Sequence, residues 1–430
     1  MLALCWTDLA ATLSPLIPGY TPKVEVAFMR RNYSQAMMAI LAVLAAALAV
    51  VPSAWAATEQ TLYAFKSSED GDYPNGGLIM VKGRIYGTTM YGGAYGQGTV
   101  YELSHTKEGW VKTTLHDFTG LADGEQPWSG VVADNRGNLY GYAGSHPDGL
   151  IFELSPDGSG RWQYQVIHVF TGNGEGVGPL GGVIVDDAGN LYGATSQGGE
   201  NDCYGYPCGI IFELSPSRAG WKFNVLFYFD LHDGQGSDSP LYRDAKGNLY
   251  GVGVGGDGLD PCGTAFGLSP SGGEWDFRTL HRFRNDGWLA VWRGGCGPEG
   301  PLGMDEAGNV YGTTEGAVYR LKPAGKKWAL AVLHTFGGQG DGSNAAGGVV
   351  LDSKGNLFGA TFTGGQYGWG TVFEVSPSGK GWKESVLFSF NGYDGNHPQY
   401  GLSWGKPGEL IGATETGGSP GYGVVYAVRP

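Results

Sequence analysis

The pentapeptide GNLYG occupies residues 137–141, 189–193 and 247–251, and variants of it begin at Gly83 (GRIYG), Gly308 (GNVYG), Gly355 (GNLFG) and Gly408 (GELIG). Successive copies start between 47 and 61 residues apart. A repeat of about 50 residues with strand-like segments is typical of propellers and related arrays. The sequence therefore predicts seven structural units of one kind.

Two further segments recur in the same order around each pentapeptide. TLYAF, at 61–65, returns as TLHDF, VIHVF, VLFYF, TLHRF, VLHTF and VLFSF, and GTVYELS, from Gly98, returns as variants such as GIIFELS and GTVFEVS. These runs are rich in β-branched and aromatic residues and are bounded by Gly, Pro or Ser, which favours strands. In the third repeat, the four expected strands begin near Gly181, Asn190, Ile210 and Asn224. We therefore predict an all-β fold, a seven-bladed β-propeller of four-stranded antiparallel blades.

The first and last repeats are expected to share a blade. Residues 61–65 resemble only the outermost strand of a repeat, and the segment from Gly408 onward supplies only inner strands. An N-terminal outer strand would complete the last blade and cover two exposed sheet edges.

Spacing within the repeats predicts turns and packing. Five copies carry an Asp three residues before Gly-Asn, a hairpin signal in which Asp accepts backbone hydrogen bonds and Gly takes a positive φ. Six repeats place a Phe eight residues after a Trp, as in Trp110 and Phe118. Even spacing predicts that this Trp and Phe lie on one face of the outer strand. His116, His168, His281 and His334 share one strand position with Tyr63, Phe227 and Phe388, which indicates packing.

The N-terminal segment has the pattern of a secretory signal peptide over residues 29–56. Arg30 and Arg31 precede an apolar run at 36–51, and Ala54-Trp55-Ala56 forms a cleavage signal. A membrane anchor is the weaker interpretation, because the apolar run is shorter than the roughly 20 residues of a span. We expect residues 1–28 to be a dispensable extension or the product of an early start codon. Residues 57–430 would then be a single propeller domain, secreted or periplasmic, cleaved near Ala56 and without stable membrane insertion.

The net charge and the number of cysteines indicate which partners and which covalent links to expect. The formal net charge of −14, without basic clusters, argues against nucleic acid as a partner. Four cysteines follow the signal segment, and an even number in an exported chain predicts two disulfides. Of the three connectivities, the simplest pairs Cys203 with Cys208 and Cys262 with Cys296. We expect a monomer.

The sequence contains no G-x-S-x-G elbow, no H-E-x-x-H, no P-loop and no EF-hand loop. We therefore assign no catalytic residue, metal ligand or cofactor. Two carboxylates from different blades could still meet at the central channel, as glycoside cleavage requires.

Two loops depart from the repeat and carry aromatic residues. In a propeller, the connections between the second and third strands (b–c) and between the fourth strand and the next blade (d–a) lie on one face. Insertions near residues 199–209 and 284–297 fall on this face. The candidate ligand-binding residues there are Trp128, Tyr204, Tyr206, Trp288, Trp292 and Trp369. They form either a surface for a glycan or protein or small cores within the loops themselves.

Taken together, GNLYG-T-T, G-T-V-F-E-L-S-P, G-W, V-L-H-x-F and D-G-x-x-P-x-G-G closely resemble the tandem repeat of the choice-of-anchor GloVer-containing proteins. A weaker likeness to kelch-type propellers rests on the Gly pair followed by an aromatic residue and a Trp. The resemblance implies an exported bacterial protein. The sequence is consistent with two functions. The first is non-catalytic binding of a glycan or protein through the b–c/d–a face of the propeller, and the second is hydrolysis or lyase-type cleavage of a polysaccharide by carboxylates at the channel.

Overall fold

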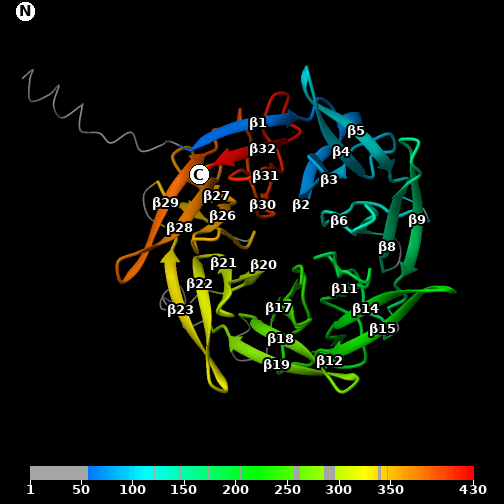
Figure 1. Cartoon of the computed structure of the whole chain (residues 1–430), viewed down its shortest axis with the longest axis vertical. Coiled ribbons are helices and arrows are strands. Elements are labelled where there is room, and N and C mark those ends of the chain that lie inside the picture. The colour runs from blue at the N-terminus through cyan, green and yellow to red at the C-terminus, as the bar shows by residue number, and fades with distance from the viewer. Residues whose placement is uncertain are drawn as a thin grey trace, which may run out of the picture. The chain divides into compact units, whose positions relative to one another are not determined.

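In the part of the chain that the structure describes, seven four-stranded antiparallel sheets surround a central axis (Figure 1). The structure is a computed structural model, and it describes residues 57–430 except 121, 145–147, 173, 204, 256–261, 285–295, 338–339 and 346. Each sheet is one blade, and in six of the seven its strands run in chain order from the axis outward. The predicted seven-bladed propeller is confirmed.

Six blades are each built from one continuous stretch of chain. From the innermost strand (a) to the outermost (d), blades 1 to 3 consist of β2 (Asp72–Val81), β3 (Arg84–Tyr91), β4 (Thr99–Thr106) and β5 (Gly109–Asp117); β6 (Val132–Ala133), β7 (Leu139–Ala143), β8 (Leu150–Pro156) and β9 (Trp162–Val169); and β10 (Val183–Val185), β11 (Leu191–Ala194), β14 (Ile210–Ser217) and β15 (Gly220–Tyr228). Blades 4 to 6 consist of β16 (Tyr242–Arg243), β17 (Leu249–Gly253), β18 (Thr264–Ser271) and β19 (Glu274–Arg282); β20 (Pro298–Met304), β21 (Val310–Thr314), β22 (Ala317–Ala324) and β23 (Lys327–Thr335); and β25 (Val350–Leu351), β26 (Leu357–Thr361), β28 (Thr371–Ser378) and β29 (Gly381–Ser389).

Blade 7 is shared by the two ends of the described chain. Its strands are β30 (Ser403–Trp404), β31 (Leu410–Thr414), β32 (Val424–Arg429) and, outermost, β1 (Thr58–Ala64). β1 pairs antiparallel with β32, with Thr61 opposite Tyr426. Beyond the strand, Phe65 donates its backbone N–H to the Gly423 carbonyl at 3.1 Å. The expected closure is confirmed, because β1 covers an edge of β32 that would otherwise be unpaired.

The GNLYG-type segment is the turn between strands a and b. Gly189 has a φ of +86°, and its backbone N–H donates to the Asp186 carbonyl at 3.0 Å. The Asp186 carboxylate accepts the backbone N–H groups of Ala188 and Asn190 at 3.0 and 2.9 Å. The Asp therefore satisfies the turn amides, as the pattern predicted.

The buried clusters lie between blades. One joins Tyr86, Val100 and Phe118 of blade 1 to Leu139 and Phe152 of blade 2. The Phe118 and Phe152 rings meet edge to face, with centroids 5.5 Å apart. Each fully buried side chain of this size contributes roughly 1.5–3 kcal/mol, so these contacts hold neighbouring blades together.

The prediction that Trp and Phe share one face of strand d is wrong. Trp110 packs in the cluster between blades 7 and 1, whereas Phe118 packs between blades 1 and 2. The reason is a β-bulge: Tyr101 lies opposite Thr114 and Val100 opposite His116, which leaves Leu115 as an extra residue. One extra residue reverses the alternation of faces. The same register shift recurs in all seven outer strands, leaving Leu62, Leu115, Ile167, Leu226, Leu280, Leu333 and Leu387 unpaired.

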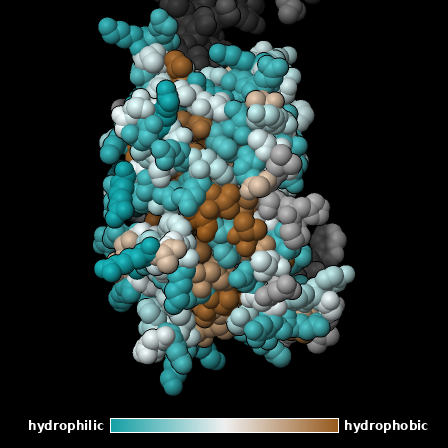
Figure 2. All heavy atoms as spheres, turned by 90° about the vertical axis from the view of Figure 1, so that its right-hand side faces the viewer, coloured by the Kyte–Doolittle hydropathy of each residue, from teal (hydrophilic) through white to brown (hydrophobic). Residues whose placement is uncertain are grey.

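The outer strands also leave apolar surface at the rim. Figure 2 views the rim from the side of β9, where hydrophobic residues form a band among hydrophilic ones. Val169 on β9 is 47% exposed, and Val111 on β5 is 44% exposed. The described residues contain no helix with the length and hydrophobicity of a membrane span.

Candidate ligand-binding site

One position in the repeat lines the central channel in five of the six blades where it is described. Each d–a connection enters strand a through a buried residue, which is Pro74, Pro127, Pro179, Ser237, Pro298, Ala345 or Pro398. The residue that follows differs in every blade, and the seventh such position, 346, lies outside the described residues. We refer to the other six as the channel residues; they are Asn75, Trp128, Leu180, Asp238, Glu299 and Gln399.

A cavity of about 400 Å³ opens where the channel residues converge. All of them except Asn75 line it, together with Tyr400, which follows Gln399. Farther along the inner strands the walls are apolar, and they include Leu78, Val131 and Val183. Polar and aromatic groups at the mouth above apolar walls are the usual composition of a small-molecule site.

Contacts between adjacent blades hold the mouth of the channel in place. The Thr313 hydroxyl donates to the Glu299 carbonyl at 3.3 Å and accepts the Gly348 N–H at 3.0 Å. The Ser239 hydroxyl accepts the Gly300 N–H at 3.0 Å. Since these bonds join backbone segments of neighbouring blades, the channel residues stand on a fixed frame, which lowers the entropic cost of binding.

Two channel residues are acids with raised pKa values. Asp238 is exposed to the channel, yet the surrounding protein desolvates its carboxyl and raises the carboxyl pKa, which the Ser196 hydrogen bond lowers in part. Burial also raises the pKa of Glu299, with further contributions from the negative charges of Glu315 and Asp238. The mouth therefore contains two carboxyl groups that hold protons more tightly than ordinary acids. Such groups can accept hydrogen bonds from hydroxyls or exchange protons with a ligand.

A second polar cluster adjoins the mouth at blade 7. Glu415, which is 4% exposed, has a raised pKa because of burial, and it forms a hydrogen bond with the Tyr73 hydroxyl. Burial, followed by the charge of Glu415, raises the pKa of Tyr400, whose hydroxyl is hydrogen-bonded to Asn75. Tyr400 thus remains a neutral hydroxyl at the cavity.

The structure separates the aromatic residues that the sequence grouped. Trp128 lines the cavity and is 40% exposed. Trp369, in the b–c loop of blade 6, is 42% exposed and meets His397 edge to face at 5.8 Å, but it does not line the cavity. Tyr206 is 73% exposed and is also outside the cavity lining. Tyr204, Trp288 and Trp292 lie outside the described residues.

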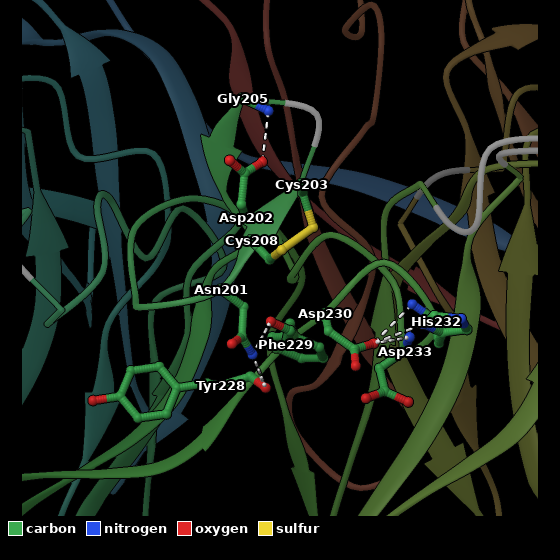
Figure 3. The surroundings of a disulfide bond; sticks show 10 residues. All are labelled: Asn201, Asp202, Cys203, Gly205, Cys208, Tyr228, Phe229, Asp230, His232 and Asp233. Carbon is green, nitrogen blue, oxygen red and sulfur yellow. Dashed lines mark hydrogen bonds and ion pairs between the residues drawn. A yellow bond between two sulfur atoms is a disulfide. The ribbon is translucent and has the colours of Figure 1, made fainter.

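Two disulfides brace the same face. Cys203 is bonded to Cys208 and Cys262 to Cys296, which is the pairing expected from the sequence. Figure 3 shows the first bond closing the small hairpin of β12 (Asp202–Cys203) and β13 (Tyr206–Pro207). In the same view, the Asn201 amide points to the Phe229 carbonyl, to which it donates at 3.0 Å, and so ties this loop to the next d–a connection.

A larger depression, of about 1420 Å³, lies on the outer rim between β19 and β23. Its lining includes Arg282, Arg284, Lys326 and Lys327. Arg284 directly precedes residues 285–295 in the sequence, which are outside the described part of the chain, and we place no site there.

Asp238 and Glu299 were not singled out from the sequence, although a signal for them exists. The residue before each channel residue is Pro in five repeats, whereas the channel position holds a different residue type in every described blade. Variation at one position within an otherwise uniform repeat marks residues that the fold does not require.

Comparison with known proteins identifies the repeat and the fold. The Gloeobacter/Verrucomicrobia repeat matches residues 51–161, 142–316 and 314–430. No curated protein matches the chain. Virginiamycin B lyase from Staphylococcus aureus is 10% identical, with 87% of this chain and 99% of that chain covered and a TM-score of 0.53. The extracellular domain of a putative hybrid two-component system from B. thetaiotaomicron is 13% identical, with a TM-score of 0.54. The match covers 87% of this chain and 42% of that chain. Likenesses at this level of identity show the fold alone.

Proposed function

The chain belongs to the Gloeobacter/Verrucomicrobia repeat family, and we propose that it is an exported, non-catalytic propeller that binds the end of a glycan at the mouth of its channel. The observation that carries this proposal is the cavity of about 400 Å³ lined by Trp128, Asp238, Glu299 and Tyr400. The two disulfides support export, because such bonds persist in oxidising compartments.

The size of the cavity favours a small ligand or the terminus of a chain over a folded protein. Specific protein interfaces bury roughly 800 Å² on each partner, whereas pockets of about 300–1,000 Å³ enclose small molecules. Because the mouth joins residues from several blades, the ligand would be held only by the intact propeller.

The chemistry of the lining favours a neutral sugar. Carboxylates such as Asp238 accept hydrogen bonds from hydroxyl groups, and the Tyr400 hydroxyl can donate as well as accept. The exposed Trp128 ring offers an apolar face with a polar edge, which suits a sugar that presents both C–H and O–H groups. Paired acids within a chain of net charge −14 disfavour anionic ligands.

One observation favours the enzymatic alternative, a polysaccharide hydrolase or lyase. Glycoside cleavage uses two carboxyl groups in one site, one of them with a raised pKa. Asp238 and Glu299 line one cavity, and the pKa of each is raised. The two functions are separated by whether a bound glycan is released intact.

The first experiment is a glycan array probed with wild type and with Trp128→Ala. We expect wild type to retain at least one neutral glycan, and the Ala variant to bind it at least about tenfold more weakly, as the loss of one central aromatic contact implies. Tyr393→Ala is the matched control, since Tyr393 is 87% exposed on a d–a connection and does not line the cavity. Its affinity should match that of wild type.

The retained glycan is then incubated with wild type, Asp238→Asn and Glu299→Gln, and the products are separated. An intact glycan with every protein supports binding without catalysis. Cleavage by wild type that both variants abolish would establish the enzyme instead. Retention of every captured glycan by Trp128→Ala, with an unchanged melting temperature, would rule out the channel mouth as the binding site.

A further inference from the structure

The outer interfaces between blades contain a recurring set of three residues. The first is the residue of strand d that follows the bulge, the second is an acid in the d–a connection, and the third lies two residues after the Trp of the next strand d. At the interface of blades 1 and 2 these are His116, Asp123 and Tyr164, with the His116 and Tyr164 rings stacked at 3.9 Å. At the interface of blades 7 and 1 they are Tyr63, Asp70 and Lys112.

The set at the interface of blades 7 and 1 is satisfied by its own members. Lys112 Nζ lies 3.4 Å from Asp70 Oδ1, so a cation balances the acid. His168 stacks on Phe223 at 4.4 Å, as His116 does on Tyr164, and these contacts confirm that both histidines pack against aromatic residues.

The interface of blades 5 and 6 is different, because it combines a histidine at the first position with acids at both other positions. Here His334 of β23, Asp341 of the connection and Glu384 of β29 come together. His334 Nε2 and Asp341 Oδ2 are 3.1 Å apart, and the potential ligand atoms of all three residues lie within 4.8 Å of one another. The His334 and Asp341 side chains are only 21% and 11% exposed.

One carboxylate oxygen of Glu384 is unsatisfied. Its Oε1 atom is buried and has no hydrogen-bond partner among the described residues. Burial, with the charge of Asp341, raises the Glu384 pKa to about 7, although Lys383 partly offsets this. A buried carboxylate oxygen beside a second acid is costly unless a cation neutralises it.

We propose that His334, Asp341 and Glu384 form a binding site for one divalent transition-metal ion that joins the outer edges of blades 5 and 6. One imidazole nitrogen and two carboxylates suit Zn²⁺ or Mn²⁺, and they supply too few oxygens for Ca²⁺. Two ligands of a tetrahedral Zn²⁺ ion at about 2.0–2.1 Å are themselves about 3.4 Å apart, close to the observed separation of His334 and Asp341. Water would complete the coordination.

The repeat supplies natural substitutions for a test. Blade 5 carries Leu330 where blade 6 carries Glu384, and blade 6 carries Phe388 where blade 5 carries His334. Glu384→Leu and His334→Phe therefore place in the site residues that this fold already accommodates. His116→Phe is the matched control, because it changes the same position at an interface with only one acid.

The experiment is calorimetric titration of the chelator-treated full chain with ZnCl₂ and, separately, with MnCl₂ and CaCl₂. We expect one Zn²⁺ or Mn²⁺ per chain, a higher melting temperature with the metal, and at least about a tenfold loss of affinity in Glu384→Leu and His334→Phe. His116→Phe should bind as wild type does. Glu384→Gln replaces the Leu variant if that protein fails to fold.

Three outcomes would overturn the proposal. They are the absence of Zn²⁺ and Mn²⁺ binding by wild type, binding of Ca²⁺ alone, and wild-type affinity in both site variants.

Discussion

At the scale of single residues, two interactions explain the GNLYG-type segment: the hydrogen bonds of its turn and the close approach of an aromatic ring. Its preceding Asp satisfies the turn, as Asp186 does by accepting the backbone N–H groups of Ala188 and Asn190 and the Tyr192 hydroxyl at 3.2 Å. Its last Gly makes room for an aromatic side chain, since a Cβ on Gly193 would lie 2.5 Å from the ring of Phe212, which is opposite in the sheet. The pentapeptide is thus specified by one turn and one close contact.

Replacing the turn Asp should destabilise the propeller measurably. Asp186→Ala removes several hydrogen bonds to a side chain that is 7% exposed, and we expect it to cost about 2–3 kcal/mol. The melting temperature, measured by calorimetry, should fall by roughly 2–5 °C. Asp187→Ala, which changes the exposed neighbour, should have no effect; equal losses in the two variants would contradict this role.

The structural residues were predictable because they recur in the repeat, whereas the acidic residues of the site were not. Comparing copies identified the turn Asp and the packing histidines because each recurs. Asp238 and Glu299 come from different blades and meet only when the ring closes, so no spacing along the chain brings them together. Trp128 was predicted as a ligand-binding residue because it is an aromatic residue on the expected face.

At the scale of elements, the outer strands show that one extra residue moves all later side chains to the opposite face of the sheet. The spacing of Trp and Phe was read correctly, but the bulge between them was not anticipated. Each bulge residue is Leu or Ile, as at Leu115 and Ile167. Because such residues are equally common in regular strands, the sequence alone could not locate the bulge.

The outermost strand of blade 7 should make stability depend on pH. Burial raises the pKa of Glu59 on β1 to about 7, the Thr61 hydroxyl lowers it in part, and the charge of Asp394 raises it further. Between pH 4.5 and about 7 the folded chain therefore holds a proton that the unfolded chain releases, so stability falls as the pH rises through this window.

The measurement is the melting temperature of wild type and Glu59→Gln between pH 4.5 and 8. The Gln variant cannot ionise, and at pH 8 it should melt roughly 1–3 °C above wild type. Near pH 4.5 the two should coincide. Glu69→Gln, which changes an exposed acid outside β1, is the control, and a constant difference between Glu59→Gln and wild type at every pH would contradict the assignment to Glu59.

At the scale of the whole molecule, the pairing of β1 with β32 closes the ring of blades that surrounds the candidate site. The cavity is lined by inner strands of several blades, including blades 1 and 7 at the point of closure. The number of blades and the shared blade were predictable because both follow from counting repeats. The channel residues were not predicted as a group, because they occupy the one position that the repeat leaves variable.

The most direct test of this account is a crystal structure of the protein with a glycan retained on the array. We predict that the sugar occupies the channel mouth, with its ring against Trp128 and its hydroxyls within hydrogen-bond distance of Asp238 or Glu299. A sugar bound elsewhere, on the outer rim or on the opposite face, with the channel residues untouched, would contradict it.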